Sequence, residues 1–172
     1  FSKREPYSKE NLKGDLENLE SFYKNRGFLK FNIDSSSVSL SEDKKNIFIT
    51  INISENDLFF NNEVSYAGDL PDAIDPFAII QITQFIVPNN VFSQEALTYA
   101  EDQITSLMSN QGFSSAEVIA STEEAEKENF VDITIFIDPG QRTYVRKINF
   151  SGNKRTHDVV LRREMRQMEG SW

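Results

Sequence analysis

The sequence repeats one order of structural elements at a spacing of about 84 residues. Gly68 and Gly152 are 84 residues apart, and each follows a short run in which apolar residues occupy alternating positions. This alternation predicts a β-strand with one apolar face, and the glycine after it permits a turn with positive φ. A constant internal period indicates a tandem array of one module.

Other elements keep the same spacing. They are a helix start, a helix end and a strand, each of which occurs twice, 84 or 85 residues apart. The matching segments are residues 7–12 and 92–97, 25–28 and 110–113, and 47–53 and 131–137. Agreement across three kinds of element is hard to obtain by chance, so the repeat is structural.

The repeat divides the chain into one complete module and two partial ones. We expect the second half of a module (helix, strand, strand) at residues 1–56, a complete module at residues 57–140, and the first half of the next (strand, helix) at residues 141–172. The complete module reads as strand, helix, helix, strand, strand. Two helices over one face of a three-stranded mixed sheet would bury its apolar side chains, so the predicted fold class is α+β.

Polar residues mark the predicted helix starts, and apolar residues mark the predicted buried faces. Ser8, Asp75, Ser93 and Thr156 are the expected N-caps, and Gly27 is expected to end the first helix. A strand over residues 144–150 is expected before the last helix. The inward positions are Leu12, Leu16, Leu19, Phe22 and Tyr23; Phe77, Ile80 and Phe85; Leu97, Ala100, Ile104, Leu107 and Met108; and Val160, Leu161, Met165 and Met168.

The net charge of −9 is unevenly distributed. Residues 57–140 contain 1 basic residue against 15 acidic ones, whereas residues 141–172 contain 8 basic residues against 3 acidic ones. An acidic centre argues against a general nucleic-acid-binding surface. The opposite charges could attract adjacent modules, or they could simply be solvated faces, and the sequence leaves both interpretations open.

The composition also bears on membrane insertion and on redox chemistry. No run of about 20 apolar residues occurs, so no transmembrane helix is expected. The N-terminus lacks the apolar core of a signal peptide, and we expect either a mature fragment or a targeting signal further upstream. Cysteine is absent, which excludes disulfides and thiolate chemistry. A periplasmic module fits this composition, although many cytosolic domains also lack cysteine.

The sequence indicates neither an enzyme nor a cofactor or metal site. The single histidine, His157, has no second histidine or cysteine with which to complete a metal site. The paired carboxylates Glu123 and Glu124 fall in an acidic turn, where no apolar wall would raise a pKa. No glycine-rich phosphate loop, serine nucleophile motif or dinucleotide fingerprint is present.

Two stretches carry a resemblance to a known family. Residues 144–153, continued by residues 160–172, resemble the start of the barrel-proximal domain among the polypeptide-transport-associated (POTRA) domains of the BamA family of outer-membrane β-barrel assembly factors. Residues 26–35 are similar to the later half of the third domain of that family. The resemblance implies that the chain holds the second half of the third POTRA domain, the whole fourth and the first half of the fifth.

The resemblance also implies a function. It implies a non-catalytic periplasmic scaffold of an outer-membrane protein in a Gram-negative bacterium, which docks accessory lipoproteins and guides unfolded β-barrel substrates, partly by strand addition. Membrane contact would come only through a barrel outside this sequence. Two alternatives stay open. One is the POTRA region of another outer-membrane translocation protein, and the other is a polyanion-binding module that acts through the basic C-terminal stretch.

Two surfaces are candidate binding sites. An edge strand has unpaired backbone groups, to which an extended peptide can add. Residues 30–40 are the favoured edge because they are serine-rich and carry few charges, and residues 115–121 are the other; an edge strand without a partner would have the same pattern. The candidate edge residues are Phe31, Ile33, Ser35, Ser37 and Val38. The candidate basic face, for a protein partner or the acidic neighbouring module, comprises Arg155, Arg162, Arg163 and Arg166.

The partial modules suggest self-association. The strand and helix expected at residues 141–172 lack a cover for their apolar faces, and so do the elements at residues 1–56. The end of one chain could complete the beginning of another, as in domain swapping. The alternative is that the partial modules fray and only residues 57–140 fold stably.

Overall fold

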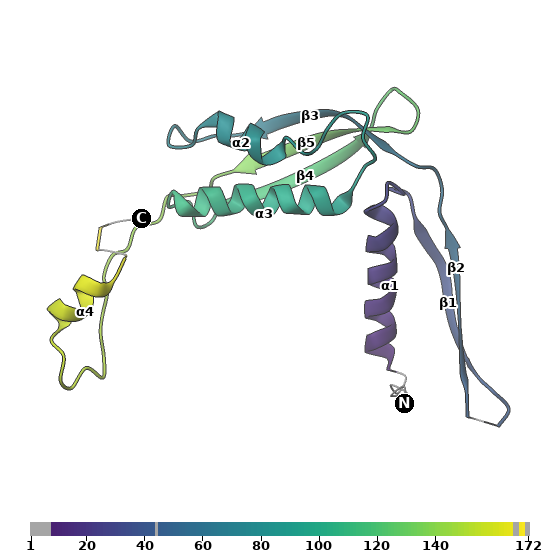
Figure 1. The fold of residues 1–172 in the computed structure, drawn as a ribbon, viewed down its shortest axis with the longest axis horizontal. Helices are drawn as coiled ribbons and strands as arrows, with labels where there is room; N and C mark the ends of the chain where they lie inside the picture. Colours follow the sequence, from purple (N-terminus) through teal and green to yellow (C-terminus); the bar gives the residue numbers. More distant parts are fainter. Residues whose placement is uncertain (1–7, 44, 167–168, 171–172) are drawn as a thin grey trace. The chain divides into compact units, whose positions relative to one another are not determined.

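A computed structural model describes residues 8–43, 45–166 and 169–170 of the chain (Figure 1). Its elements follow the order that the repeat predicts up to residue 138. They are α1 (Lys9–Lys24), β1 (Asn32–Leu40), β2 (Ile47–Ser54), β3 (Phe60–Gly68), α2 (Pro76–Thr83), α3 (Gln94–Asn110), β4 (Glu117–Glu124), β5 (Phe130–Asp138) and α4 (Asp158–Glu164).

The chain forms two compact units. The first comprises Phe1–Ser65, Gln84–Tyr99 and Ala120–Thr134, and the second comprises Tyr66–Thr83, Ala100–Ile119 and Ile135–Trp172, within the described ranges. Helix α3 and strands β3, β4 and β5 continue from one unit into the other. These units are not the modules that the repeat predicts, and the module boundaries at residues 56 and 140 stay a prediction.

The predicted α+β fold, with a mixed three-stranded sheet and two helices, is confirmed. The strand order is β3-β5-β4, so β5 is central and β3 and β4 are edges. The amide of Phe60 donates to Asn129 O and that of Asp69 donates to Ile137 O, so β3 and β5 run in the same direction. Helices α2 and α3 lie over this sheet (Figure 1).

Side chains of β5 and α3 form most of the core. Alternation along β5 buries Val131, Ile133, Ile135 and Ile137 on one face, with exposed fractions between 0% and 3%. From α3, four of the five side chains predicted to point inward are buried, namely Leu97, Ala100, Ile104 and Met108. Period 2 in the strand and period 3.6 in the helix therefore identify the same core.

The predicted helix caps are mostly present. Ser8 Oγ accepts the amide of Asn11 at 3.4 Å, Ser93 Oγ accepts the amide of Ala96 at 3.4 Å, and Asp75 Oδ1 accepts the amide of Phe77 at 2.9 Å. A side-chain oxygen can satisfy an amide that has no partner within the helix, which explains why these helices begin where they do.

Strands β1 and β2 form a separate antiparallel hairpin, in which Leu40 pairs with Ile47 and Ser36 with Ile51. As predicted, four isoleucines of β2 alternate along the strand: Ile47, Ile49, Ile51 and Ile53. Their exposed fractions lie between 37% and 46%, in contrast to the buried residues that occupy the repeat-equivalent positions of β5. In the described part of the chain this sheet has only two strands, and helix α1, beside it, has no buried residue.

The predicted inward face of the second helix is wrong. Phe77, Ile80 and Phe85 are exposed, whereas Ile79 and Thr83 are the buried residues of α2. Positions four residues apart lie on one helix face, and the Thr83 hydroxyl can be buried because it bonds Ile79 O at 3.2 Å and the Tyr66 hydroxyl. Helix α2 ends at Thr83, so Phe85 lies beyond it.

The predicted strand over residues 144–150 is also wrong, since these residues form no strand. A strand is held by pairing with a neighbouring strand. Here the Ile148 amide donates to Glu169 Oε1 at 3.0 Å, and Ile148 O accepts from Arg162 Nη2 at 2.7 Å, so side chains occupy its backbone groups instead.

The last helix differs from its prediction as well. Helix α4 has His157 and not Thr156 at its N-cap position, with no side-chain cap. Val160 and Met165, two of the predicted inward residues, are exposed. Tyr7 of the repeat and Met168 of the predicted inward stripe lie outside the described residues.

Candidate functional site

Strand β1 lies at the edge of its sheet. It pairs with β2 on one side, and no other described strand pairs with it. The repeat relates β2 to β5, and therefore β1 to β4, which is an edge strand of the complete sheet. Both observations leave one side of the β1 backbone open.

A β-bulge interrupts the open strand at its beginning. The register shifts between Ile33 and Ser35, which makes Asp34 the additional residue. The Asp34 carboxylate accepts Ser54 Oγ at 2.6 Å and Asn32 Nδ2 at 2.9 Å. These two hydrogen bonds, that from Ser54 first, lower the pKa of Asp34. Bulges increase the local twist of an edge and commonly lie beside functional sites.

Beyond the bulge, the edge is exposed and uncharged. Ser35 Oγ accepts Asn52 Nδ2 at 2.8 Å, which ties the strand to β2. Ser37 and Val38 are exposed, whereas Ile33 is half-buried. No charged side chain occurs between Asp34 and Glu42. Charged residues commonly block edge strands, so this segment lacks a usual barrier to strand addition.

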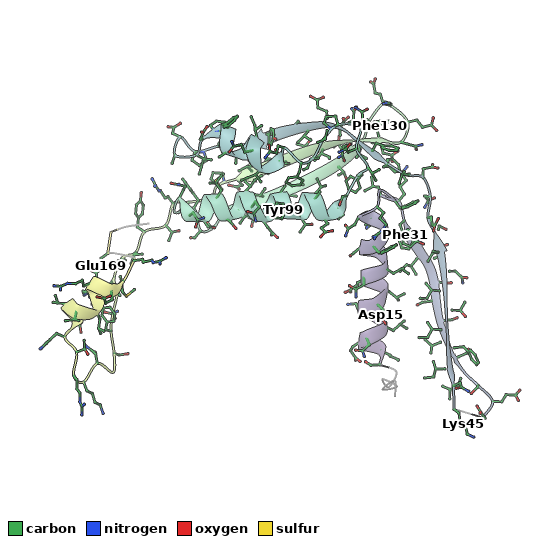
Figure 2. All side chains as sticks on the ribbon, viewed as in Figure 1. Asp15, Phe31, Lys45, Tyr99, Phe130 and Glu169 are labelled. Carbon is green, nitrogen blue, oxygen red and sulfur yellow. The ribbon has the colours of Figure 1, made fainter. Side chains whose placement is uncertain are left out.

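Phe31 differs from the other predicted edge residues, because it precedes β1 and is buried. Its ring stacks on Tyr23 of α1, with centroids 4.1 Å apart and planes 7° apart (Figure 2). Tyr23 in turn donates its hydroxyl hydrogen to Glu55 Oε1 at 2.7 Å, which raises the pKa of Tyr23. Phe31 therefore belongs to the packing between helix and hairpin, which alternation along the strand does not reveal.

The predicted basic face does not form as one helix surface. Only Arg162 and Arg163 lie in α4, while Arg155 precedes it and Arg166 follows it. Arg162 Nη1 contacts Glu169 Oε1 at 2.9 Å, and its guanidinium lies 5.5 Å from the centre of the Phe150 ring. Two hydrogen bonds, first from the Ile148 amide and then from Arg162, lower the pKa of Glu169, which Figure 2 labels. Arg162 therefore stabilises its own segment.

The end of α1 is joined to the segment before β3 within the first unit. Gly27 has φ 94°, as predicted for the residue that ends the helix, and its carbonyl accepts the Phe59 amide at 2.8 Å. Asn25 Oδ1 accepts the Glu95 amide at 2.8 Å, so a residue at the end of α1 caps the first turn of α3. This cap was not predicted, because no local pattern relates residues 70 positions apart.

A groove beside β3 was missed by the sequence analysis. It lies in the second unit, between the end of β3 and helix α2. The available signal was the apolar sequence of α2, which we assigned entirely to the core. Among the described residues, no cluster of three or more histidines, cysteines or carboxylates could bind a metal. No helix of the described chain combines the length and the apolar character that crossing a membrane requires.

Comparison with known proteins gives a family match over most of the sequence. The family described as surface antigen variable number repeat (POTRA) matches residues 1–56, 62–140 and 143–172. The chain is 32% identical over 168 residues to outer membrane protein assembly factor BamA of Buchnera aphidicola subsp. Acyrthosiphon pisum, and 28% identical over 165 residues to that of Neisseria meningitidis serogroup B. Each alignment covers 96% of this chain, but only 26% and 20% of the respective relative.

A solved structure shares the fold. The crystal structure of Haemophilus influenzae BamA POTRA3-5 matches with a TM-score of 0.78 and 25% sequence identity. The match covers 100% of this chain and 66% of that one. The chain thus corresponds to a part of its relatives that is rich in POTRA domains.

Proposed function

The chain belongs to the POTRA family, and from that premise we propose that it is a non-catalytic periplasmic scaffold of an outer-membrane protein assembly machine. Its relatives are named outer membrane protein assembly factors. The proposed partners are unfolded β-barrel proteins, which offer extended strands, and accessory lipoproteins of the assembly complex. The proposed domains are residues 1–56, 57–140 and 141–172.

The open edge of β1 is the observation that carries this proposal. Its outward backbone groups can be identified from the hairpin register. The Ser41 amide donates to Asn46 O at 2.9 Å, so in the antiparallel alternation Ser37 and Ser39 face β2. Ser36 and Val38 then face the open side. An added strand would take its hydrogen bonds from these residues, while the side chains of Ile33, Ser35, Ser37 and Val38 would contribute selectivity.

The exposed arginines are a second element of the proposal. Arg155, Arg163 and Arg166 are exposed. We assign them to a protein partner with an acidic surface, because a stacking site for nucleic-acid bases would need aromatic side chains among them.

A strand-addition assay tests the proposed function. The probe is a fluorescein-labelled synthetic peptide with the alternating sequence of an outer-membrane β-strand, and fluorescence anisotropy measures its binding. Ser36→Pro removes an outward amide hydrogen and leaves the ladder to β2 in place. We expect binding to weaken by roughly tenfold or more, while Ser36→Ala binds like the wild type. Equal binding by Ser36→Pro and Ser36→Ala contradicts the proposal.

A further inference from the structure

The end of β3 and helix α2 enclose an apolar groove that no predicted site includes. Its volume is about 170 Å³, and it lies entirely in the second unit. The residues that line it are Tyr66, Ala67, Gly68, Leu70, Ile79 and Ile80, with Asp69, Pro76 and Ile137 at its margins. An apolar cavity of about 150 Å³ accepts a benzene ring, so this groove can hold one large apolar side chain.

The groove is open to solvent and firmly built. Tyr66, Leu70 and Ile80 are all exposed, although they are large and apolar. The Tyr66 hydroxyl is hydrogen-bonded to the buried Thr83 hydroxyl of α2, which joins the strand to the helix. The shape of the groove therefore exists before anything binds, which lowers the entropic cost of binding.

The edge of β3 is covered only at its beginning. Phe59 O accepts the Phe92 amide at 3.0 Å, and Asn61 exchanges two hydrogen bonds of 2.8 Å with Asn89 and Asn90. No described segment pairs with this side of β3 after Asn61. The open part of the strand runs directly into the groove. An extended chain that paired with this edge would bring a side chain to the groove.

The surroundings of the groove are acidic. The segment from Tyr66 to Thr83 contains Asp69, Asp72 and Asp75 and no lysine or arginine. All three aspartates are exposed. Complementary charge accelerates association and excludes partners of like charge. The groove therefore favours an apolar side chain flanked by lysine or arginine.

We propose that the groove between β3 and α2 binds an extended peptide segment in which a large apolar residue is flanked by basic residues. The segment adds to the open edge of β3 after Asn61, its apolar side chain enters the groove beside Ile80, and its basic residues approach Asp69 and Asp72. This site shares no residue with the proposed β1 site, so either can fail without the other.

The test measures binding of a synthetic peptide to the full 172-residue chain. The probe is a fluorescein-labelled hexapeptide of alternating lysine and leucine, followed by fluorescence anisotropy. Ile80→Ser removes an exposed apolar wall and should weaken binding by roughly five- to tenfold, since about a tenfold loss accompanies each 1.4 kcal/mol. Ile119→Ser on β4 is the matched control, because the exposed fractions of Ile80 and Ile119 are 51% and 56%. The control should bind like the wild type.

Charge and strand pairing are tested separately. The double variant Asp69→Asn, Asp72→Asn should weaken binding severalfold at low salt, whereas Asp102→Asn, Glu117→Gln, which removes two exposed carboxylates elsewhere, should not. A peptide with glutamate in place of lysine, and one N-methylated at alternate amides, should both bind more weakly. The proposal is overturned if the lysine–leucine peptide does not bind, if Ile119→Ser weakens binding as much as Ile80→Ser, or if the N-methylated peptide binds equally well.

Discussion

The backbone amide of Phe59 donates a hydrogen bond of 2.8 Å to the carbonyl oxygen of Gly27. The repeat contains the same bond a second time, because the amide of Thr143 donates to Gly112 O, also at 2.8 Å. Both glycines end a helix with positive φ, 94° and 91°. Each bond thus joins the end of one helix to the start of the next repeat of the sequence, which makes the positive φ of these glycines part of how successive repeats are connected.

Replacement of Gly27 tests this connection. A Cβ at Gly27 would lie 2.7 Å from Val91 Cγ1, 2.8 Å from Leu58 Cδ1 and 3.1 Å from Phe59 O. We expect Gly27→Ala to destabilise the chain by about 1–3 kcal/mol, from backbone strain and crowding together. The urea midpoint measures the effect.

Gly14→Ala is the matched control for Gly27→Ala. Gly14 lies within α1, and nothing lies within 4 Å of an added Cβ. Alanine is the better helix former by about 1 kcal/mol, so this variant should be slightly more stable. A similar urea midpoint for both variants would show that Gly27 is not constrained.

Asn25 supplies a cap across the joined segments. Asn25→Ala removes the acceptor of the Glu95 amide in the first turn of α3 and should cost about 1 kcal/mol. Its repeat counterpart is Asn110, for which the described structure records no side-chain hydrogen bond. Asn110→Ala should therefore change the thermal midpoint less, and a larger effect at Asn110 would refute the capping role of Asn25.

The bulge on β1 predicts a pH dependence. Hydrogen bonds lower the pKa of Asp34 in the folded state, so their contribution is present above the unfolded pKa of about 3.9 and is lost as pH falls through the folded value. Ser54→Ala removes the principal hydrogen bond and should raise the pKa of Asp34 in an NMR titration. Ser37→Ala should leave that pKa unchanged. An unaltered titration of Asp34 in Ser54→Ala would contradict the assignment.

Arg162 holds residues 148–169 together, whereas Arg163 does not. Arg162→Ala removes the contacts with Ile148 O and Glu169, so we expect a higher pKa for Glu169 and faster hydrogen exchange at the Ile148 amide. Arg163→Ala should change neither observable. Identical exchange at Ile148 in the two variants would mean that the Arg162 contacts do not order this segment.

The exposed face of β2 predicts self-association. Large exposed apolar patches mark interaction sites, and the isoleucines of β2 are exposed where their repeat equivalents in β5 are buried. We expect light scattering to show an average mass that rises with concentration, and a smaller rise for the double variant Ile49→Ser, Ile51→Ser. A chain that ends at Gln141 should also associate less if the C-terminal segment of a second copy covers this face. A constant monomer mass would refute self-association.

The candidate sites were only partly predictable. The edge position of β1 follows from the repeat and from the serine-rich, uncharged sequence, both of which are visible in the chain. The burial of Phe31 against Tyr23 and the occupation of Arg162 by Glu169 depend on residues 8 and 7 positions away, respectively, that no periodicity relates to them. The groove beside β3 was missed because the apolar pattern of α2 does not show which of its faces is covered.

The sequence by itself determined the repeat, the order of elements from α1 to β5, the caps at Ser8, Asp75 and Ser93, and the buried face of β5. These features follow from local chemistry, namely backbone preference, side-chain periodicity and hydrogen bonds to nearby amides. Only the tertiary structure decided which face of α2 is buried, why residues 144–150 form no strand, and how Asn25 caps α3. Burial and strand pairing require a partner from elsewhere in the chain, and the position of that partner is decided by packing.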